Sequence, residues 1–144
     1  MPAETIAIAA DHAGFELKES LKAALEARGL TALDLGTASK DSVDYPDFAD
    51  RLAGALKDGR ATRGVLVCGT GIGIAIAANR HRHVRAAVCH DATSARLSRL
   101  HNNANVLALG ARLVGPEVAK DCLEIFLATA FEGGRHERRV AKMS

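Results

Sequence analysis

The chain has 144 residues, 48% of them hydrophobic, and a formal net charge of +2, which suits one domain around one buried core. So small a net charge does not predict binding to nucleic acid or to membranes by bulk attraction, and four Phe, one Tyr and no Trp leave few rings for stacking on bases. Three unclustered cysteines, Cys68, Cys89 and Cys122, predict neither a disulfide framework nor a zinc site.

The first third of the chain alternates a β-branched run with helical patterns. Thr5–Ala10 predicts a strand, and Gly14–Arg28 predicts a helix with one leucine stripe. A second strand is expected near Thr31–Leu35, followed by a polar loop over Gly36–Tyr45. Pro46 suits the first turn of a helix that buries one apolar face.

The same alternation continues to the end of the chain. It predicts, in order, a strand at Val65–Cys68, a short helix to about Asn79, a strand at Val84–Val88, a helix at Asp91–His101, a strand at Val106–Leu109 and a long helix opened by Pro116. The basic tail, residues 131–144, is expected to end in a short helix. Strands alternating with helices predict an α/β fold with a five-stranded parallel sheet flanked by about five helices. In such sheets ligands bind outside the carboxyl ends of the strands.

The first residues lack a basic start followed by a long apolar run, so we expect no signal peptide. The longest near-apolar run, Ile72–Ala78, is too short to cross a bilayer. We therefore expect a cytoplasmic protein whose cysteines are reduced.

The sharpest motif is the run Cys68-Gly69-Thr70-Gly71-Ile72-Gly73, which joins an apolar strand to a helix. Glycines allow close backbone approach, and free amides at a helix start favour an anion. The run has no P-loop lysine, and Ile74 stands where a dinucleotide-binding pattern needs its last glycine. Taken alone, the motif is equally consistent with a tight turn that permits close packing.

Cys68 adds chemistry to this loop, because a thiol at a helix start has its thiolate favoured. A thiolate beside an anion-binding loop could remove a carbon-bound proton or attack a carbonyl. The alternative is a small buried hydrophobe, the commoner fate of a free cysteine. We expect that fate for Cys89 and Cys122.

Several polar residues stand where the predicted elements end. Asp11 and His12 follow the first strand, at the rim of the expected site, although Asp11 could simply cap a helix. His101 and Asn102 end a helix, where a dipole-matched histidine is also unremarkable. His81 and His83 stand among arginines, and no carboxylate lies close by in sequence to complete a metal-ligand set with them, so we expect no metal.

Arg135 and Arg139 stand four residues apart in the tail and would share one helix face. The planar guanidinium of arginine suits phosphate, because it donates two parallel hydrogen bonds. On these residues alone, a solvated amphipathic tail is the better interpretation.

Taken together, the sequence resembles the type B ribose-5-phosphate isomerases, a family that includes the galactose-6-phosphate isomerase subunits. The resemblance covers essentially the whole chain. It rests on Ala10-Asp11-His12-Ala13-Gly14-Phe15, Asp44-Tyr45-Pro46, the Cys68–Gly73 loop with Ala77-Ala78-Asn79, His101-Asn102 with Asn105-Val106-Leu107, and Glu132-Gly133-Gly134-Arg135-His136.

The resemblance implies a Rossmann-like three-layer sandwich over residues 1–144, with the tail 131–144 contributing to the active site. It implies a homodimer or a dimer of dimers with active sites shared between subunits, and no cofactor or metal. It assigns Cys68 as the base that moves a proton between C1 and C2, and Gly69–Gly73 as the anion hole for the enediolate. A family branch with a carboxylate base has it where this chain has Ile74, so the chain resembles the cysteine branch.

The resemblance also distributes the remaining roles. His101 would protonate the ring oxygen during ring opening, with Asp11 and Thr70 assisting at the sugar hydroxyls. The substrate-binding residues would be His12, Tyr45, Asn102, Arg112, Arg135 and Arg139, and among them His12 and the three arginines would hold the phosphate.

We therefore expect an aldose–ketose isomerase that interconverts ribose 5-phosphate and ribulose 5-phosphate through a cis-enediolate. The alternative substrate is a 6-phosphohexose such as allose or galactose 6-phosphate. A nucleotide- or flavin-binding α/β module, and a partner subunit with a degenerate site, are the competing interpretations.

Overall fold

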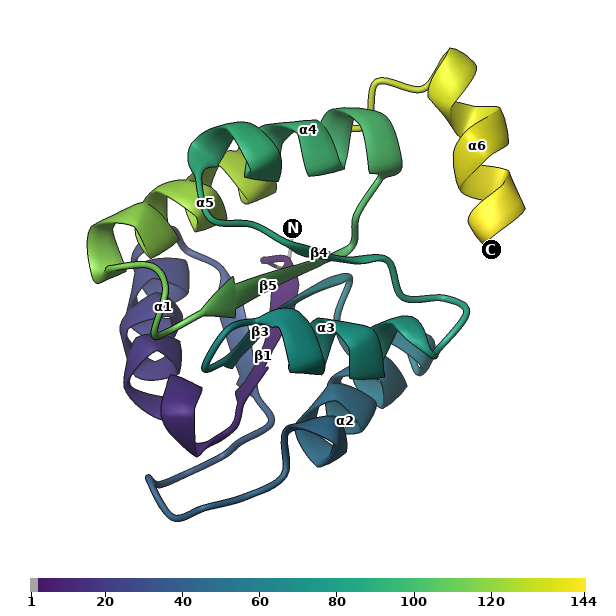
Figure 1. The fold of residues 1–144 in the computed structure, drawn as a ribbon. Helices are drawn as coiled ribbons and strands as arrows, with labels where there is room; N and C mark the ends of the chain where they lie inside the picture. Colours follow the sequence, from purple (N-terminus) through teal and green to yellow (C-terminus); the bar gives the residue numbers. More distant parts are fainter. Residues whose placement is uncertain (1–2) are drawn as a thin grey trace.

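The computed structural model describes residues 3–144, which form one parallel sheet between two layers of helices (Figure 1). The strands lie in the order β2-β1-β3-β5-β4. Their bounds are β1 Thr5–Ala10, β2 Thr31–Asp34, β3 Arg63–Cys68, β4 Ala86–Val88 and β5 Val106–Gly110. The predicted five-stranded parallel α/β fold is confirmed.

Six α-helices occur within these described residues, together with a single 3-10 turn, η1 (His12–Gly14). The helices are α1 Phe15–Ala27, α2 Tyr45–Lys57, α3 Ile72–Asn79, α4 Ala92–Asn102, α5 Pro116–Ala128 and α6 Arg135–Met143. The helix expected in the basic tail is therefore α6. None of the helices in residues 3–144 is long and apolar enough to cross a membrane.

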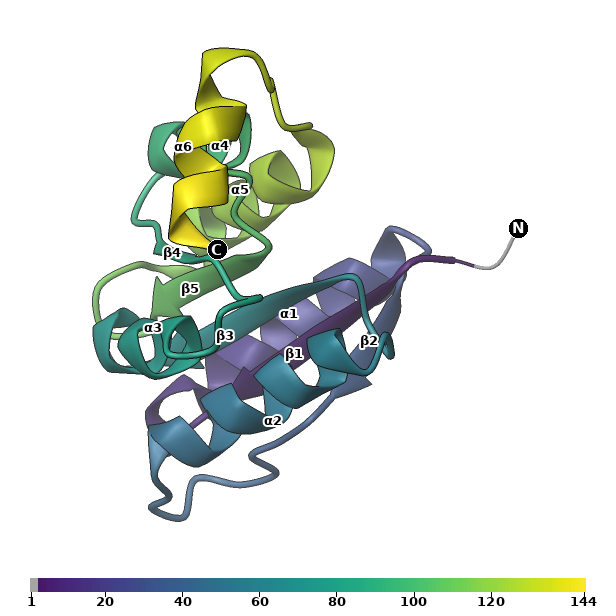
Figure 2. The same cartoon turned by 90° about the vertical axis from the view of Figure 1, so that its right-hand side faces the viewer.

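The two faces of the sheet are covered by different helices (Figures 1 and 2). Ile6 and Ile8 of β1 point into one apolar cluster, with α1 and α5, whereas Ala7 and Ala9 point into the other, with α2 and α3. This alternation follows from the two-residue period of a strand. All four strand residues are fully buried, as expected for a central parallel strand.

Among the element boundaries that differ from the sequence prediction, two are explained by local hydrogen bonds. The helix expected from Gly14 begins at Phe15, because the side chain of Asp11 caps η1 by accepting from the amide of Gly14. The strand expected from Val84 begins at Ala86. Upstream of it, the amide of Arg85 donates to a side chain, Oδ1 of Asn105, at 2.7 Å.

The direction of the helices decides which ends of the chain segments meet. In a parallel α/β fold the helices run antiparallel to the strands, so their carboxyl ends lie at the amino edge of the sheet. The end of α4 lies at that edge, and α6 packs beside it, away from the sheet (Figures 1 and 2).

Candidate active site

A pocket of about 400 Å³ opens at the carboxyl ends of β1 and β3, where the sheet topology predicts a site. It is lined by Asp11, His12, Ala13, Tyr45, Cys68, Gly69, Thr70, Ile72, Gly73 and Arg112. Residues from four separate segments thus converge on one cavity, and most of the predicted substrate-binding residues are among them.

Asp11 and His12 are held in place by the turn that ends β1. Asp11 is 6% exposed, and its Oδ1 accepts from the amide of Gly14 at 3.1 Å. The Nδ1 atom of His12 accepts from the amide of Val43 at 3.2 Å. A neutral His12 therefore carries its proton on Nε2 and can use it as a hydrogen-bond donor.

The glycine loop has the geometry of an anion-binding turn. Gly71 adopts φ 78°, and a Cβ there would lie 2.9 Å from the backbone carbon of Leu109, so a side chain is excluded by both conformation and space. The Thr70 hydroxyl accepts from the amide of Ile72 at 3.1 Å. Helix α3 begins at Ile72, and amides of a first helical turn, such as that of Gly73, have no acceptor within the helix.

Cys68 ends β3 and lines the pocket although only 4% of its surface is exposed. Its Sγ accepts from the amide of Gly71 at 3.2 Å. The other two cysteines are buried in the opposite apolar cluster. Burial raises the pKa of the Cys89 thiol and raises that of Cys122 to about 11. The prediction that both are small buried hydrophobes is confirmed by their burial.

Tyr45 and Arg112 close two sides of the loop. A Cβ on Gly73 would lie 2.6 Å from Cζ of Tyr45, so the tyrosine ring lies directly over this glycine. Arg112 follows β5, and a Cβ on Gly69 would lie 3.3 Å from its Nη1. The exposed Arg112 thus presents a positive charge beside the anion loop.

The structure does not bring the other predicted site residues into this pocket. His101, Asn102, Arg135 and Arg139 lie on α4 and α6, whose shared contact is at the amino edge of the sheet. Asn102 lines a separate pocket of about 410 Å³ that also includes Asn79, Arg85 and Met143. Within one chain, these predicted residues and Cys68 stand at opposite edges of the sheet.

Glu132 and His136 join His101 in a cluster that sequence reasoning missed. One ligand atom from each lies within 4.8 Å of the others, the spacing of a possible metal site. The rings of His101 and His136, however, are stacked, with centroids 4.4 Å apart and planes at 17°. Nearly parallel rings cannot direct their lone pairs to one ion unless a ring turns.

Comparison with known proteins decides the family. A family model described as Ribose/Galactose Isomerase matches residues 6–143. The chain belongs to this family. It is 48% identical over 135 residues to ribose-5-phosphate isomerase B of Escherichia coli, covering 94% of this chain and 91% of that protein. It is 46% identical over 140 residues to D-erythrulose-4-phosphate isomerase of Pectobacterium atrosepticum, covering 96% of this chain and 92% of that protein.

Solved structures of this ribose/galactose isomerase family have the same fold. A ribose 5-phosphate isomerase from Thermotoga maritima matches with a TM-score of 0.95 at 51% identity, covering 97% of both chains. A ribose-5-phosphate isomerase B from Clostridium thermocellum matches with a TM-score of 0.95 at 48% identity, covering 96% of this chain and 94% of that one. The resemblance noted in the sequence is confirmed, and the isomerase is favoured over a nucleotide-binding module.

Proposed function

We propose that this chain, an aldose–ketose isomerase by family, interconverts ribose 5-phosphate and ribulose 5-phosphate. The observation that carries the proposal is the Cys68 sulfur, which accepts an amide N–H in a pocket shared with Asp11, His12 and Arg112. A base, backbone donors and positive charge in one cavity are what proton transfer next to a carbonyl in an anionic sugar requires.

The reaction follows from this arrangement. Cys68, as a thiolate, removes the proton from C2 of the open-chain aldose, and the C–H electron pair forms a C1–C2 double bond while negative charge develops on O1. An amide that donates to sulfur, here that of Gly71, stabilises the thiolate charge. The proton on O2 passes to O1, the thiol returns its proton to C1, and the ketose is formed.

The backbone amides at the start of α3 stabilise the charge that develops on O1. Such preorganised donors are commonly the largest catalytic contribution, and losing one typically costs about 10²–10³ in rate. The phosphate is remote from the reacting carbons, so the Nε2–H of His12 and the guanidinium of Arg112 act mainly by positioning the substrate.

We further propose a homodimer or a dimer of dimers in which each active site is shared. The roles implied for His101, Asn102, Arg135 and Arg139 need them near Cys68, which one chain does not achieve. Ile72 and Ile76 support a partner at this edge: they are 50% and 65% exposed on α3, one turn apart, and Ile72 also lines the pocket.

We also propose a cytoplasmic location. All three cysteines are free and buried, with no disulfide among them. Free thiols fit a reducing compartment.

The test is an aldose-to-ketose assay across ribose 5-phosphate, erythrose 4-phosphate, allose 6-phosphate and galactose 6-phosphate, with and without a chelator. We expect ribose 5-phosphate to have the highest kcat/KM and the chelator to change nothing. One relative, at 46% identity, is named for a four-carbon sugar phosphate. Preference for the four-carbon sugar would therefore replace the pentose assignment. Preference for either hexose phosphate would do the same.

The base is tested by Cys68→Ala, with Cys89→Ala as the matched control. We expect kcat to fall by about 10³-fold in Cys68→Ala, since general acid–base catalysis contributes 10²–10⁴, while binding of the sugar phosphate survives. Cys89 lies 1% exposed in the other apolar cluster, so Cys89→Ala should turn over normally. Near-normal turnover by Cys68→Ala would remove Cys68 from the base role.

A further inference from the structure

Among the residues that the structure describes, His136 holds the one buried side-chain nitrogen or oxygen atom that lacks a hydrogen-bond partner. It is 5% exposed, and within residues 3–144 its Nε2 atom has no hydrogen-bond partner. The nearest acidic oxygen, Oε1 of Glu132, lies 3.9 Å away. No hydrogen bond orients the ring through this atom, and the face of the ring lies against His101.

The stack joins two elements that are far apart in the sequence. His101 stands in the last turn of α4, and His136 stands in the first turn of α6. Gly133 and Gly134 turn the chain between them with φ 73° and 59°. The amide of Glu132 donates to the carbonyl of Leu100 at 3.1 Å, next to His101. The tail is thus attached to α4 directly beside the stacked pair.

Burial and the charges around the pair favour the neutral form of His136. Burial lowers the pKa of His136, as do Arg135, His101 and Arg139, and Glu132 opposes them. These groups come from α4, from α6 and from the segment before it. A neutral flat ring can support a neighbouring imidazolium, whereas two charged rings in contact would repel.

We propose that His136 is a positioning residue: its ring face fixes the His101 imidazole in the orientation from which His101 passes a proton to the sugar ring oxygen. This inference rests on the proposed function, in which His101 opens the ring. In ring opening the His101 proton moves to the ring oxygen as the bond between C1 and that oxygen breaks. The anomeric hydroxyl gives its proton to the carboxylate of Asp11, which assists at the sugar hydroxyls, and its oxygen becomes the C1 carbonyl. His136 does not touch substrate.

The test compares two substrates of which only one needs ring opening. Ribose 5-phosphate closes through its O4, whereas erythrose 4-phosphate carries its phosphate on that oxygen and has no hydroxyl able to form a five-membered ring. We expect His136→Ala to lower kcat/KM for ribose 5-phosphate at least about 10-fold more than for erythrose 4-phosphate, because a misplaced acid loses part of its contribution. His136→Phe restores a flat ring and should recover to within about 3-fold of wild type.

Val140→Ala is the control, because Val140 is the other buried residue of α6. It should loosen the helix and change the kcat/KM of both substrates alike. Equal losses on both substrates in His136→Ala, or no recovery in His136→Phe despite a native circular dichroism spectrum, would overturn the positioning role.

A second measurement needs no turnover. In the wild-type chain, the ring current of His136 should shift the NMR signal of the His101 Cε1 proton, and His136→Ala should abolish that shift. An unchanged His101 signal overturns the stack itself. Failure of the wild-type chain to isomerise ribose 5-phosphate would instead overturn the proposed function, and the NMR result would still decide whether His136 orients His101.

Discussion

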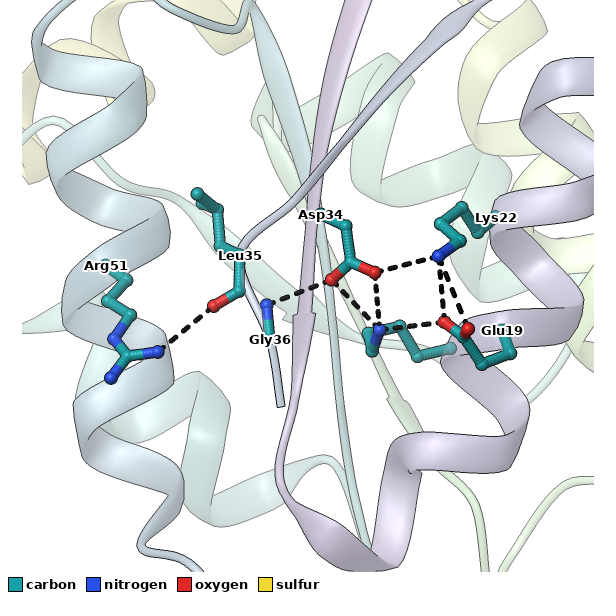
Figure 3. Close-up of polar contacts among 7 residues, drawn as sticks. Glu19, Lys22, Asp34, Leu35, Gly36 and Arg51 are labelled. Atoms are coloured by element: carbon teal, nitrogen blue, oxygen red, sulfur yellow. Dashed lines mark hydrogen bonds and ion pairs between the residues drawn. The ribbon is translucent and has the colours of Figure 1, made fainter. Parts of the chain in front are cut away.

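The Nζ atom of Lys18 lies 2.8 Å from Oδ2 of Asp34 although the lysine side chain is only 1% exposed. Asp34 ends β2 and also accepts from Lys22 and from the amide of Gly36, each at 2.9 Å (Figure 3). Gly36 in turn hydrogen-bonds the end of β1 through Ala10. A buried charge on α1 is therefore linked to the loop that leads to Tyr45 and the active site.

We predict that substituting the two partners of this ion pair lowers the free energy of unfolding by unequal amounts. Asp34→Asn leaves the ammonium of Lys18 buried with only the half-exposed Glu19, and should cost about 3 kcal/mol, the range for a buried charge that loses its partner. Lys18→Met leaves Asp34 paired with Lys22 and should cost about 1 kcal/mol or less. Urea unfolding measures both, and equal losses would contradict this account.

Acid should lower the stability of the fold by protonating the carboxylate of Asp34. Burial alone would raise the pKa of Asp34, but hydrogen bonds from Lys18, Lys22 and Gly36 outweigh it and lower the pKa below its ordinary value of 3.8. The unfolded chain therefore binds this proton first, so the stabilisation is present above the ordinary value and is lost as pH falls through the folded value. Chemical denaturation at pH 6, 4 and 3 should show wild-type stability falling more steeply than that of Asp34→Asn.

Alanine substitutions at two glycines should change the free energy of unfolding in opposite directions. At Gly14 a Cβ would lie 2.6 Å from the carbonyl oxygen of Val67, a backbone atom that cannot swing away. Gly14→Ala should cost about 2 kcal/mol and raise KM, because it displaces the turn that holds Asp11 and His12. At Gly54, inside α2, a Cβ meets nothing within 4 Å, so Gly54→Ala should stabilise by about 1 kcal/mol.

Thermal unfolding and steady-state kinetics on the two variants test this pair. Gly54→Ala should raise Tm and leave KM unchanged. A stable, fully active Gly14→Ala variant would show that the turn after β1 adapts without disturbing the site.

The sheet and the pocket were predictable because local signals agree there. The Val65–Cys68 strand is apolar throughout, the glycines follow it directly, and parallel strands bring the residues after β1 and β3 to one edge. Tyr45 entered the list of site residues only through the family resemblance. Its contact with Gly73 depends on how α2 packs against α3, which no local pattern specifies.

Burial of charged and basic groups was not predictable for the same reason. Lys18 follows Leu17 on a helix and has no sequence feature that separates it from the less buried Lys22, since its burial depends on Asp34 across the sheet edge. His136 stands in a basic tail typical of a solvated helix, and its burial depends on contact with His101, thirty-five positions earlier. The spacing Glu132-x-x-x-His136 was the only local signal for that cluster.

The arginines of α6 should differ in how much they contribute to binding the substrate phosphate. Arg135 and Arg139 are exposed and one turn apart, whereas Arg138, equally exposed, points about 100° away from Arg139. Arg139→Ala should raise KM for ribose 5-phosphate about 10-fold, as expected for loss of a charge-assisted hydrogen bond, with little change in free ribose binding. Arg138→Ala is the matched control, and equal effects of the two variants would argue against a phosphate role for this helix face.

Shared active sites predict that two inactive variants rescue each other. Cys68→Ala and His101→Ala should each be nearly inactive as homodimers, because every site lacks one group. In a mixed dimer, one site combines both defects and the other combines the intact Cys68 of one chain with the intact His101 of its partner. Random assembly of equal amounts makes half the dimers mixed, so refolding the two variants together should restore about a quarter of wild-type activity. Activity that stays at the level of the separate variants would mean that each chain builds its site alone.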